Sequence, residues 1–392
     1  MIRVAFTALG GVQWTGGHNY LLNLLTALVR YQSATLKPIL FIGSTAQSIE
    51  IEQFQALEGI EVVLTEAVDS KRQIRSLVQA VVLGRDLALR KLLVQNRIDL
   101  IFEAAQFYGR RLGIPAIAWI PDFQHRAMPT LFSMRAWLRR ELGFRAQIVG
   151  GRTIMLSSDD ARAACEFYYP STRKRTRTVR FATSAGLIVT LEQAREIARS
   201  YGLPERFFFL PNQFWKHKNH GIVIDALKIL NERGVRLVVA ASGRQHDPRH
   251  PDYFASLQQK VDALSLGEQF RFLGMLPYAH IPALMRACVA LINPSLFEGW
   301  STTVEEARSL GVPMILTDLE THYEQVGVDA RYFQRASAES LANILEEVSE
   351  STDTAREEKY SRARTDAECR FEHYAKEFYE LVRACCNGYS PA

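Results

Sequence analysis

One segment that reads as strand, loop and helix constrains the fold of this 392-residue chain more than any other. An apolar run over residues 287–292 is typical of a buried parallel strand. Residues 304–310 predict a helix, which we expect to end at Gly311 in a left-handed C-cap. Thr302 and Glu305 have the spacing of a capping box, so the helix is expected to begin at Thr302. This order predicts an α/β fold whose loop binds anions, because the N–H groups and dipole of the helix point toward it.

Two carboxylates flank this loop. Glu298 lies before the helix, and Glu306 lies in its first turns, eight positions later. An acid near a helix start stabilises the dipole, which explains Glu305 but not Glu298, because Glu298 lies outside the helix. Carboxylates accept hydrogen bonds from hydroxyl groups. The pair beside an anion-binding helix therefore suits a phosphorylated polyol such as a nucleotide sugar.

The residues around this pair resemble the E-x7-E signature of the retaining family-4 glycosyltransferases, which have the GT-B fold. The matching residues are 294–299, then Glu306-Ala307, then 311–315. The resemblance implies an α/β protein with two Rossmann-like, doubly wound domains that face each other across a cleft. Strands that alternate with helices along the rest of the chain predict the same doubly wound parallel sheets.

The alternation weakens over residues 182–203, which places the domain boundary there. We expect an acceptor-binding domain over 1–187, a nucleotide-sugar-binding domain over 188–370, and a C-terminal helix over 371–392 that crosses back to the first domain, as in relatives. Three local expectations are a long helix over about 71–95, a basic amphipathic helix over 131–142 and a loop over 318–325.

Two loops in the first half carry candidate residues. Gly16 and Gly17 end a glycine-rich loop that is similar to the first loop of the family, and they would let backbone approach a diphosphate or the transferred sugar. After the strand over 114–120, relatives often place a histidine, sometimes His-Asp, close to the sugar. Here Asp122 occupies that place and His125 follows three residues later. This departure leaves open which of the two acts in catalysis.

The donor loops lie in the second half. Relatives carry an arginine and then a lysine after the first strand of this half, and both grip the diphosphate. Lys218 matches the lysine; the arginine is missing, Asn212 or Gln213 lies near its place, and Lys216 is expected to supply the charge. The resemblance assigns Glu306 to the ribose hydroxyls and Glu298 to the sugar hydroxyls. The candidate catalytic residues are Glu298, His125, Asp122 and Lys218; the candidate donor-binding residues are Gly16, Gly17, Asn212, Lys216, Lys218, Gly243, Ser301, Thr302, Thr303 and Glu306.

The resemblance implies retaining, metal-independent transfer of a hexose-type sugar from a nucleotide sugar to an acceptor hydroxyl, in cell-surface polysaccharide or glycolipid synthesis. No D-x-D motif argues for a metal, and no cofactor is expected beyond the nucleotide sugar as co-substrate. Two alternatives stay open. One is a non-catalytic subunit that binds a sugar nucleotide, and the other is a sugar-nucleotide epimerase on the same fold.

Charge is unevenly spread along the chain. Residues 126–180 hold twelve Lys or Arg against four acids. This composition predicts contact of residues 131–180 with an anionic membrane, beside a sugar or lipid-linked acceptor. No nucleic-acid-binding motif accompanies the charge. The apolar runs are strand-sized and the N-terminus has no signal-peptide layout, so we expect a cytoplasmic protein with peripheral contact at the inner face of the membrane.

Overall fold

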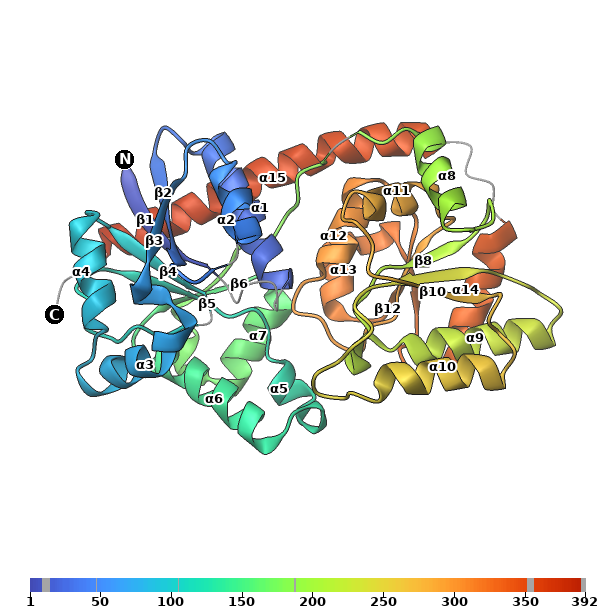
Figure 1. Ribbon diagram of the computed structural model, residues 1–392, viewed down its shortest axis with the longest axis horizontal. Coiled ribbons are helices and arrows are strands. Elements are labelled where there is room, and N and C mark those ends of the chain that lie inside the picture. Colours follow the sequence, from blue (N-terminus) through green and yellow to red (C-terminus); the bar gives the residue numbers. More distant parts are fainter. Residues whose placement is uncertain (9–14, 47, 105, 187, 351–355, 389–392) are drawn as a thin grey trace. The chain divides into compact units, whose positions relative to one another are not determined.

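The computed structural model describes residues 1–8, 15–46, 48–104, 106–186, 188–350 and 356–388. These residues form two compact units. The first unit consists of residues 1–127, 134–184 and the chain from 369 onward, and the second of residues 128–133 and 185–368. Each unit is a parallel β-sheet with helices on both faces (Figure 1).

The first unit contains a seven-stranded sheet in the order β3-β2-β1-β4-β5-β6-β7. All described strand pairs are parallel. The chain adds strands outward from β1 in one direction and then from β4 in the other, which is the doubly wound arrangement. The strands are β1 (Ile2–Thr7), β2 (Leu36–Gly43), β3 (Glu61–Thr65), β4 (Leu100–Ala104), β5 (Ala116–Trp119), β6 (Thr153–Leu156) and β7 (Thr176–Thr178).

Helices cover the two faces of this sheet differently. One face, which includes Ala5 and Ile101, packs against α4, and its continuation at Ile154 packs against α6 and α7. On the opposite face Phe6 and Phe102 contact Phe378 of α15, the last helix. The helices of this unit are α1 (Thr15–Tyr31), α2 (Ser48–Gln55), α3 (Gln73–Val82), α4 (Leu87–Gln95), α5 (Gln124–Ala127), α6 (Met134–Val149), α7 (Asp159–Tyr168) and the later part of α15 (Arg356–Asn387).

The second unit contains a six-stranded sheet in the order β10-β9-β8-β11-β12-β13. Its order reverses between β8 and β11, so both sheets confirm the predicted α/β architecture of two doubly wound parallel sheets. The strands are β8 (Phe208–Leu210), β9 (Val239–Ser242), β10 (Phe270–Gly274), β11 (Leu291–Asn293), β12 (Met314–Thr317) and β13 (Arg331–Phe333). The helices are α8 (Leu191–Ser200), α9 (His220–Glu232), α10 (Tyr253–Ala263), α11 (His280–Ala287), α12 (Thr302–Ser309), α13 (Glu320–Val326) and α14 (Ala338–Glu350).

The long helix expected over 71–95 is wrong, because the chain breaks it into α3 and α4. Gly84 lies between them with φ +72°, in the left-handed region that favours glycine. Asp86 then caps α4, because its Oδ1 accepts a hydrogen bond from the Leu89 N–H at 3.0 Å. A left-handed glycine followed by a capping acid two residues later is a helix stop and a helix start.

Three further expectations also need correction. The basic helix begins at Met134 rather than at residue 131, because 129–131 form a separate 3₁₀ turn that starts with a proline. Residues 182–203 contain α8, which begins in a capping box formed by Thr190 and Gln193. The stretch expected as a loop over 318–325 contains most of α13.

Candidate functional site

The switch point of the second sheet brings two loops together. The loop after β8 and the loop after β11 leave the carboxyl ends of neighbouring strands, the edge at which open α/β sheets bind ligands. The Leu296 N–H donates to the His217 carbonyl at 2.8 Å, which ties one loop to the other. Candidate residues from two distant parts of the sequence therefore share one edge of the sheet.

Helix α12 begins in the second of these loops. Ser301, not Thr302, is its N-cap: the Ser301 Oγ accepts from the Val304 N–H at 3.4 Å, so the predicted capping box at Thr302 is wrong by one position. Gly311 follows the helix with φ +62°, which confirms the predicted left-handed end. Thr302 and Thr303 occupy the first turn, where backbone N–H groups lack partners within the helix and attract anions.

Lys218 and Glu298 form an ion pair across these loops. The Lys218 Nζ lies 2.5 Å from the Glu298 Oε1, and the side chains are only 13% and 9% exposed. Lys218 ends a 3₁₀ turn over 216–218, and Asn219 then adopts a left-handed conformation with φ +55° before α9 begins. The structure thus joins a candidate cation for the diphosphate to a candidate carboxylate for the sugar.

A network of amides and hydroxyls lies next to this pair. Asn293, at the end of β11, donates to the Ser301 Oγ at 2.9 Å and accepts from the Asn212 Nδ2 at 3.3 Å. The Thr303 Oγ1 lies 3.5 Å from the Asn212 Oδ1. Asn212 is only 2% exposed, so the residue nearest the missing arginine positions the loop rather than supplying charge.

Gly243 supports the same loop from β9. A Cβ at this position would lie 2.5 Å from the Asn212 carbonyl oxygen, closer than real contacts allow. Its φ of +144° is also unfavourable for other residues. Gly243 therefore lets the loop after β8 pack against β9. Lys216 has an exposed side chain, and its backbone N–H donates to the Asp247 carboxylate at 3.1 Å.

Glu306 lies on α12 and faces a residue that the sequence reasoning missed. The Tyr278 hydroxyl, in the loop after β10, donates to the Glu306 Oε1 at 3.1 Å, and Tyr278 is 60% exposed. Removal of the Glu306 carboxyl from water raises its pKa to about 7, and the hydrogen bond from Tyr278 opposes this change. Its position four residues after β10, at the carboxyl end of a strand, was the sequence signal that could have identified Tyr278 as a site residue.

Helix α13 holds the Glu298 loop from behind and was also missed. The Thr321 Oγ1 donates to the Glu298 carbonyl at 3.1 Å, and the Gln325 Nε2 donates to the Ser301 carbonyl at 2.8 Å. Leu319, His322 and Val326 are buried at a spacing of three and four residues. That helical spacing was the signal that contradicted a loop.

In the first unit, His125 is fully buried. Its Nε2 lies 3.1 Å from the Glu141 Oε2, and its carbonyl accepts from the Trp137 Nε1 at 2.8 Å. Burial lowers the pKa of His125, while the hydrogen bond to Glu141 opposes this change. Asp122 keeps 25% of its side chain exposed and pairs with Arg140, Oδ1 to Nη2, at 2.6 Å. The two candidates therefore have different environments.

Glu141 is the centre of the cluster that holds His125. Its carboxylate also accepts hydrogen bonds from Arg126, from the Arg145 Nε at 2.5 Å and from the Tyr169 hydroxyl at 2.6 Å. Burial alone would raise the pKa of Glu141, but the hydrogen bonds from Arg126, Tyr169 and Arg145 outweigh it and lower the pKa to about 2. Sequence reasoning had read this acid only as part of a basic helix.

The predicted glycine-rich loop lies largely outside the described residues. Gly16 and Gly17 are described, and they lie in the first turn of α1 rather than in a loop. Gly17 is buried and Gly16 is exposed. Since α1 follows β1, both glycines still lie after the carboxyl end of a central strand.

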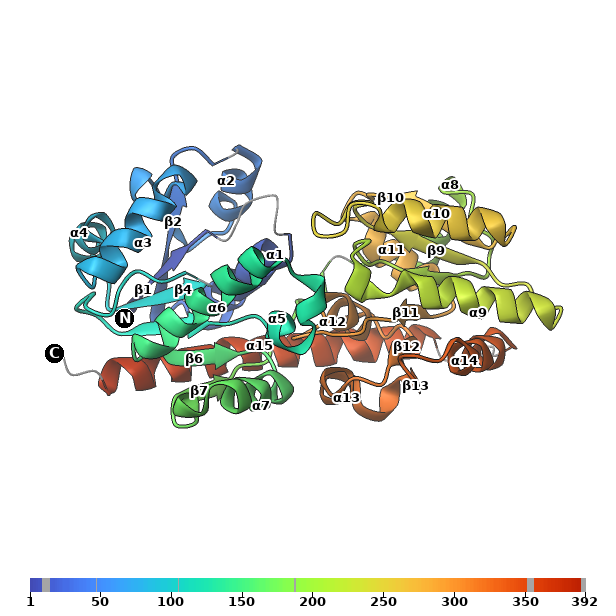
Figure 2. The same cartoon turned by 90° about the horizontal axis from the view of Figure 1, so that it is seen from below.

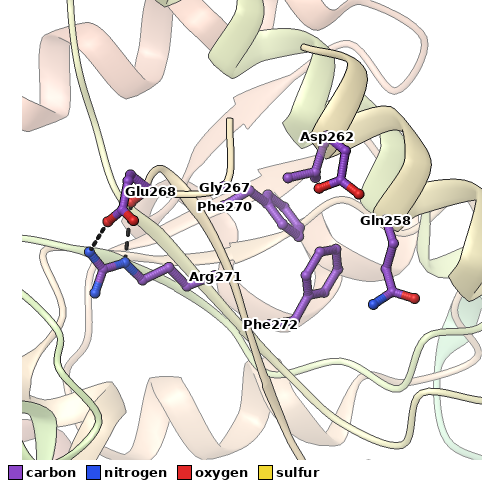
Figure 3. Close-up of a pocket in the computed structure, with 8 residues that line it drawn as sticks. Gln258, Asp262, Gly267, Glu268, Phe270, Arg271 and Phe272 are labelled. Atoms are coloured by element: carbon purple, nitrogen blue, oxygen red, sulfur yellow. Dashed lines mark hydrogen bonds and ion pairs between the residues drawn. The ribbon is translucent and has the colours of Figure 1, made fainter. Parts of the chain in front are cut away.

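A cavity of about 420 Å³ lies elsewhere in the second unit (Figure 3). Its walls include Phe270 and Phe272 of β10 and Gln258 and Asp262 of α10. Residues 267–268, which precede β10, also line it, so this cavity opens near the amino end of that strand. The candidate donor residues follow the carboxyl ends of strands, and none of them lines this cavity.

Among the described residues, no group of three or more His, Cys, Asp or Glu side chains is placed to hold a metal ion. Within the same part of the chain, no helix has both the length and the apolar character needed to cross a bilayer.

The second unit is similar in sequence to known glycosyltransferases. Residues 192–366 match the family model described as glycosyl transferases group 1. The O-antigen chain mannosyltransferase RfbU of Salmonella typhimurium is 26% identical over 149 residues, which are 38% of this chain and 40% of RfbU. The putative glycosyltransferase EpsF of Bacillus subtilis is 29% identical over 118 residues, 30% of this chain and 28% of EpsF. The chain thus aligns with well under half of the length of these relatives.

Solved structures extend the likeness to the whole chain. A glycosyltransferase from Rickettsia africae has a TM-score of 0.75 at 14% identity, with 99% of each chain covered. HepE of Anabaena, in complex with UDP and glucose, has a TM-score of 0.71 at 17% identity and covers 98% of this chain and 100% of its own. WaaG, a glycosyltransferase involved in lipopolysaccharide biosynthesis, has a TM-score of 0.61 at 13% identity, with 99% of each chain covered. These matches show that the two α/β units have the GT-B glycosyltransferase fold.

Proposed function

We propose that this protein is a retaining, metal-independent glycosyltransferase of family 4 that moves a hexose-type sugar from a nucleotide sugar to an acceptor hydroxyl. The observation that carries the proposal is the Lys218–Glu298 pair beside the N-terminus of α12. Departure of a nucleoside diphosphate places negative charge on a phosphate oxygen. A lysine and a helix N-terminus that both follow the carboxyl ends of neighbouring strands stabilise that charge.

The other donor residues take roles by their place in the same unit. Glu306 accepts hydrogen bonds from the ribose, and Glu298 accepts them from the sugar, once the diphosphate draws Lys218 away from it. Ser301, Thr302 and Thr303 present the backbone N–H groups of the α12 N-terminus. Asn212 and Gly243 hold the loop after β8, and the exposed Lys216 adds positive charge to it.

On the acceptor side we propose that Asp122 acts and that His125 positions the surrounding loop. Asp122 has exposed surface, whereas His125 has none and cannot touch a substrate in this conformation. Asp122→Asn should then lower the transfer rate. His125→Gln should lower the unfolding temperature and leave the rate of the folded enzyme nearly unchanged.

The relatives narrow the first choice of substrates. RfbU is named as a mannosyltransferase, and the structure of HepE is a complex with UDP and glucose. RfbU is named for the O-antigen chain, and WaaG is described as involved in lipopolysaccharide biosynthesis. We therefore propose a role in polysaccharide or glycolipid synthesis, at the cytoplasmic face of the membrane.

Membrane contact is the second part of this proposal. Helix α6 exposes Met134, Leu138 and Leu142, which lie one turn apart on one side of the helix. Arg135 and Arg139 are exposed beside them, and the only acid of the helix, Glu141, is buried. We propose that residues 131–180 contact an anionic membrane that carries a lipid-linked acceptor.

A thermal-shift screen tests the donor assignment. UDP-, GDP-, ADP- and dTDP-linked sugars, beginning with GDP-mannose and UDP-glucose, would be added to the purified protein. A ligand at 100 times its Kd should stabilise the folded state by about 2.7 kcal/mol. The assignment is supported if sugars linked to one nucleotide base give a larger thermal shift than the others in the wild type but not in Glu306→Ala. No shift with any donor contradicts it.

One alternative is favoured by a specific observation. The burial of His125 and the absence of the expected arginine fit a subunit that binds a sugar nucleotide without turning it over. This alternative predicts the same thermal shift but no release of nucleoside diphosphate with any acceptor. A coupled assay for the released diphosphate, with lipid extracts as acceptors, separates the two functions.

A further inference from the structure

Helix α3 carries an apolar face that the fold does not cover. Its aliphatic side chains at 74, 77, 78, 81 and 82 have the spacing of one helical face. That spacing would normally mark residues buried in the core. In this structure they point to solvent; the exposed fractions are 80% for Ile74, 51% for Leu77, 54% for Val78, 65% for Val81 and 74% for Val82.

The charges around this face are almost all positive. Residues 70–91 contain six Lys or Arg and one acid, Asp86. Asp86 is 2% exposed and caps α4, so it does not offset the basic side chains at the surface. Lys71, Arg75 and Arg85 are exposed. An exposed aliphatic helix face with basic residues at its edges is typical of helices that lie in a membrane interface.

The position of α3 in the first unit supports the same conclusion. The core residues Ala5 and Ile101 place α4, which directly follows α3, on the face of the sheet that α6 also covers. Figures 1 and 2 both show α3 and α6 on this side of the first sheet. Both helices expose aliphatic side chains together with arginines, and neither exposes an acid. Their location on one side of the sheet is compatible with contact of both helices with one anionic surface.

We propose that the exposed face of α3 docks on an anionic lipid surface, with its aliphatic side chains in the interface and the flanking basic residues on lipid headgroups. This inference rests on the membrane contact proposed for residues 131–180, and it adds a second, more apolar helix to it. Two weak contacts on one compact unit reinforce each other, because the second forms at high local concentration once the first has formed.

The charge distribution argues against a second copy of this chain as the occupant. In a two-fold symmetric dimer the same patch would face itself. Lys71, Arg75 and Arg85 of one copy would then meet those of the other around an apolar centre. Like charges so placed destabilise association, whereas an anionic lipid surface neutralises both sets at once.

Vesicle co-sedimentation with single-residue variants tests the proposal. The full chain would be mixed with vesicles of phosphatidylcholine and phosphatidylglycerol, and with vesicles of phosphatidylcholine alone. Val82→Glu places a charge in the α3 face; Val328→Glu makes the same change at a valine that is 97% exposed in the second unit. We expect Val82→Glu to weaken binding to the anionic vesicles by about tenfold or more, and Val328→Glu to leave it unchanged.

Each outcome has a separate meaning. Normal vesicle binding by Val82→Glu, with loss of binding in Leu138→Glu of α6, would overturn the role of α3 and leave the contact through residues 131–180. Absence of binding by the wild type would overturn both membrane contacts, while the thermal shift with sugar nucleotides would still report on the transferase. A wild-type dimer in light scattering that becomes monomeric in Val82→Glu would assign the face to a second copy and overturn the proposal. Unfolding temperatures of all variants, compared with the wild type, exclude misfolding as the cause.

Discussion

The donor loops of the second unit and the loop that carries His125 in the first unit each follow the carboxyl end of a parallel strand, yet they treat their polar residues differently. In the second unit Lys218 pairs with Glu298, with 13% and 9% of these side chains exposed, and Tyr278 donates to Glu306. In the first unit His125 lies fully inside a cluster centred on the buried Glu141. The same position in a fold thus carries a partly exposed ion pair in one case and a buried hydrogen-bond cluster in the other.

The difference between the two regions lies in the hydrogen-bond partners of the residues that follow each strand. Lys218 and Glu306 have partners that a ligand can replace: a single carboxylate for the lysine, and a single hydroxyl for the glutamate. His125 shares its partner with Arg126, Arg145 and Tyr169, so a ligand would have to break a whole network to reach it. Exchangeable partners mark a binding residue, and a shared buried partner marks a structural one.

Lys218→Ala should have the largest effect on this comparison. Loss of one preorganised group that stabilises developing charge costs about 2–4 kcal/mol of barrier, measured as kcat/KM for transfer. Lys216→Ala, two residues earlier in the same 3₁₀ turn and exposed, is the matched control and should lose much less. If both variants keep the wild-type rate, the lysine does not bind the diphosphate.

Glu141→Ala tests whether the cluster around His125 supports its loop. The change leaves Arg126 and the buried His125 and Tyr169 without their common acceptor, which should lower the free energy of unfolding by about 2–4 kcal/mol in urea titrations. Arg145→Ala is the control, because Arg145 is 58% exposed and its loss should cost less than about 1 kcal/mol. Full stability of Glu141→Ala would show that the cluster does not hold this loop.

Much of the fold could be predicted because it depends on local patterns. Apolar runs and helical spacing gave the alternation of strands and helices that both sheets confirm. The errors occurred where short signals compete. Gly84 and Asp86 end one helix and begin another within a few residues, and α13 begins at Glu320, three residues after β12. Such boundaries depend on backbone conformation more than on hydrophobic period.

The site could be predicted only in part. The strand and helix predicted around Glu298 correctly placed Glu298 and Ser301 in the loop after the carboxyl end of a strand. Tyr278 and Gln325 come from other strand connections, and only the folded sheet brings them to Glu306 and Ser301. Nor does local sequence show that His125 is buried, because its burial depends on Glu141, sixteen residues later on another helix.

Glu306→Ala should have a smaller effect than Lys218→Ala, and on binding rather than on rate. Hydrogen bonds from ribose hydroxyls to a carboxylate contribute about 1.5–3 kcal/mol, so donor affinity measured by calorimetry should fall by roughly tenfold or more. At a pH where Glu306 is ionised, Tyr278→Phe should act in the opposite direction, because it removes the hydroxyl that already occupies Glu306. Unchanged affinity in both variants would contradict the ribose assignment.

The smallest expected effect is a pH dependence of donor affinity. Removal from water raises the pKa of Glu306 from 4.5 to about 7 in the unliganded protein. The folded state therefore favours the protonated carboxyl, and the stability that Glu306 contributes is present below pH 4.5 and is lost as the pH rises through about 7. Ribose hydroxyls donate best to the ionised carboxylate, so donor binding should strengthen as the pH rises through about 7 and level off above it.

A nucleotide sugar is the correct probe for this measurement, because its diphosphate is esterified at both ends and does not titrate in the same range. Calorimetric affinities across the pH range should rise in the wild type and stay flat in Glu306→Gln, which cannot ionise. His322 and His220 are buried histidines near this edge, and burial lowers the pKa of both, so they stay neutral over the rise. A slope that persists in Glu306→Gln would show that another group controls binding and that Glu306, like His125, belongs to the support of its loop.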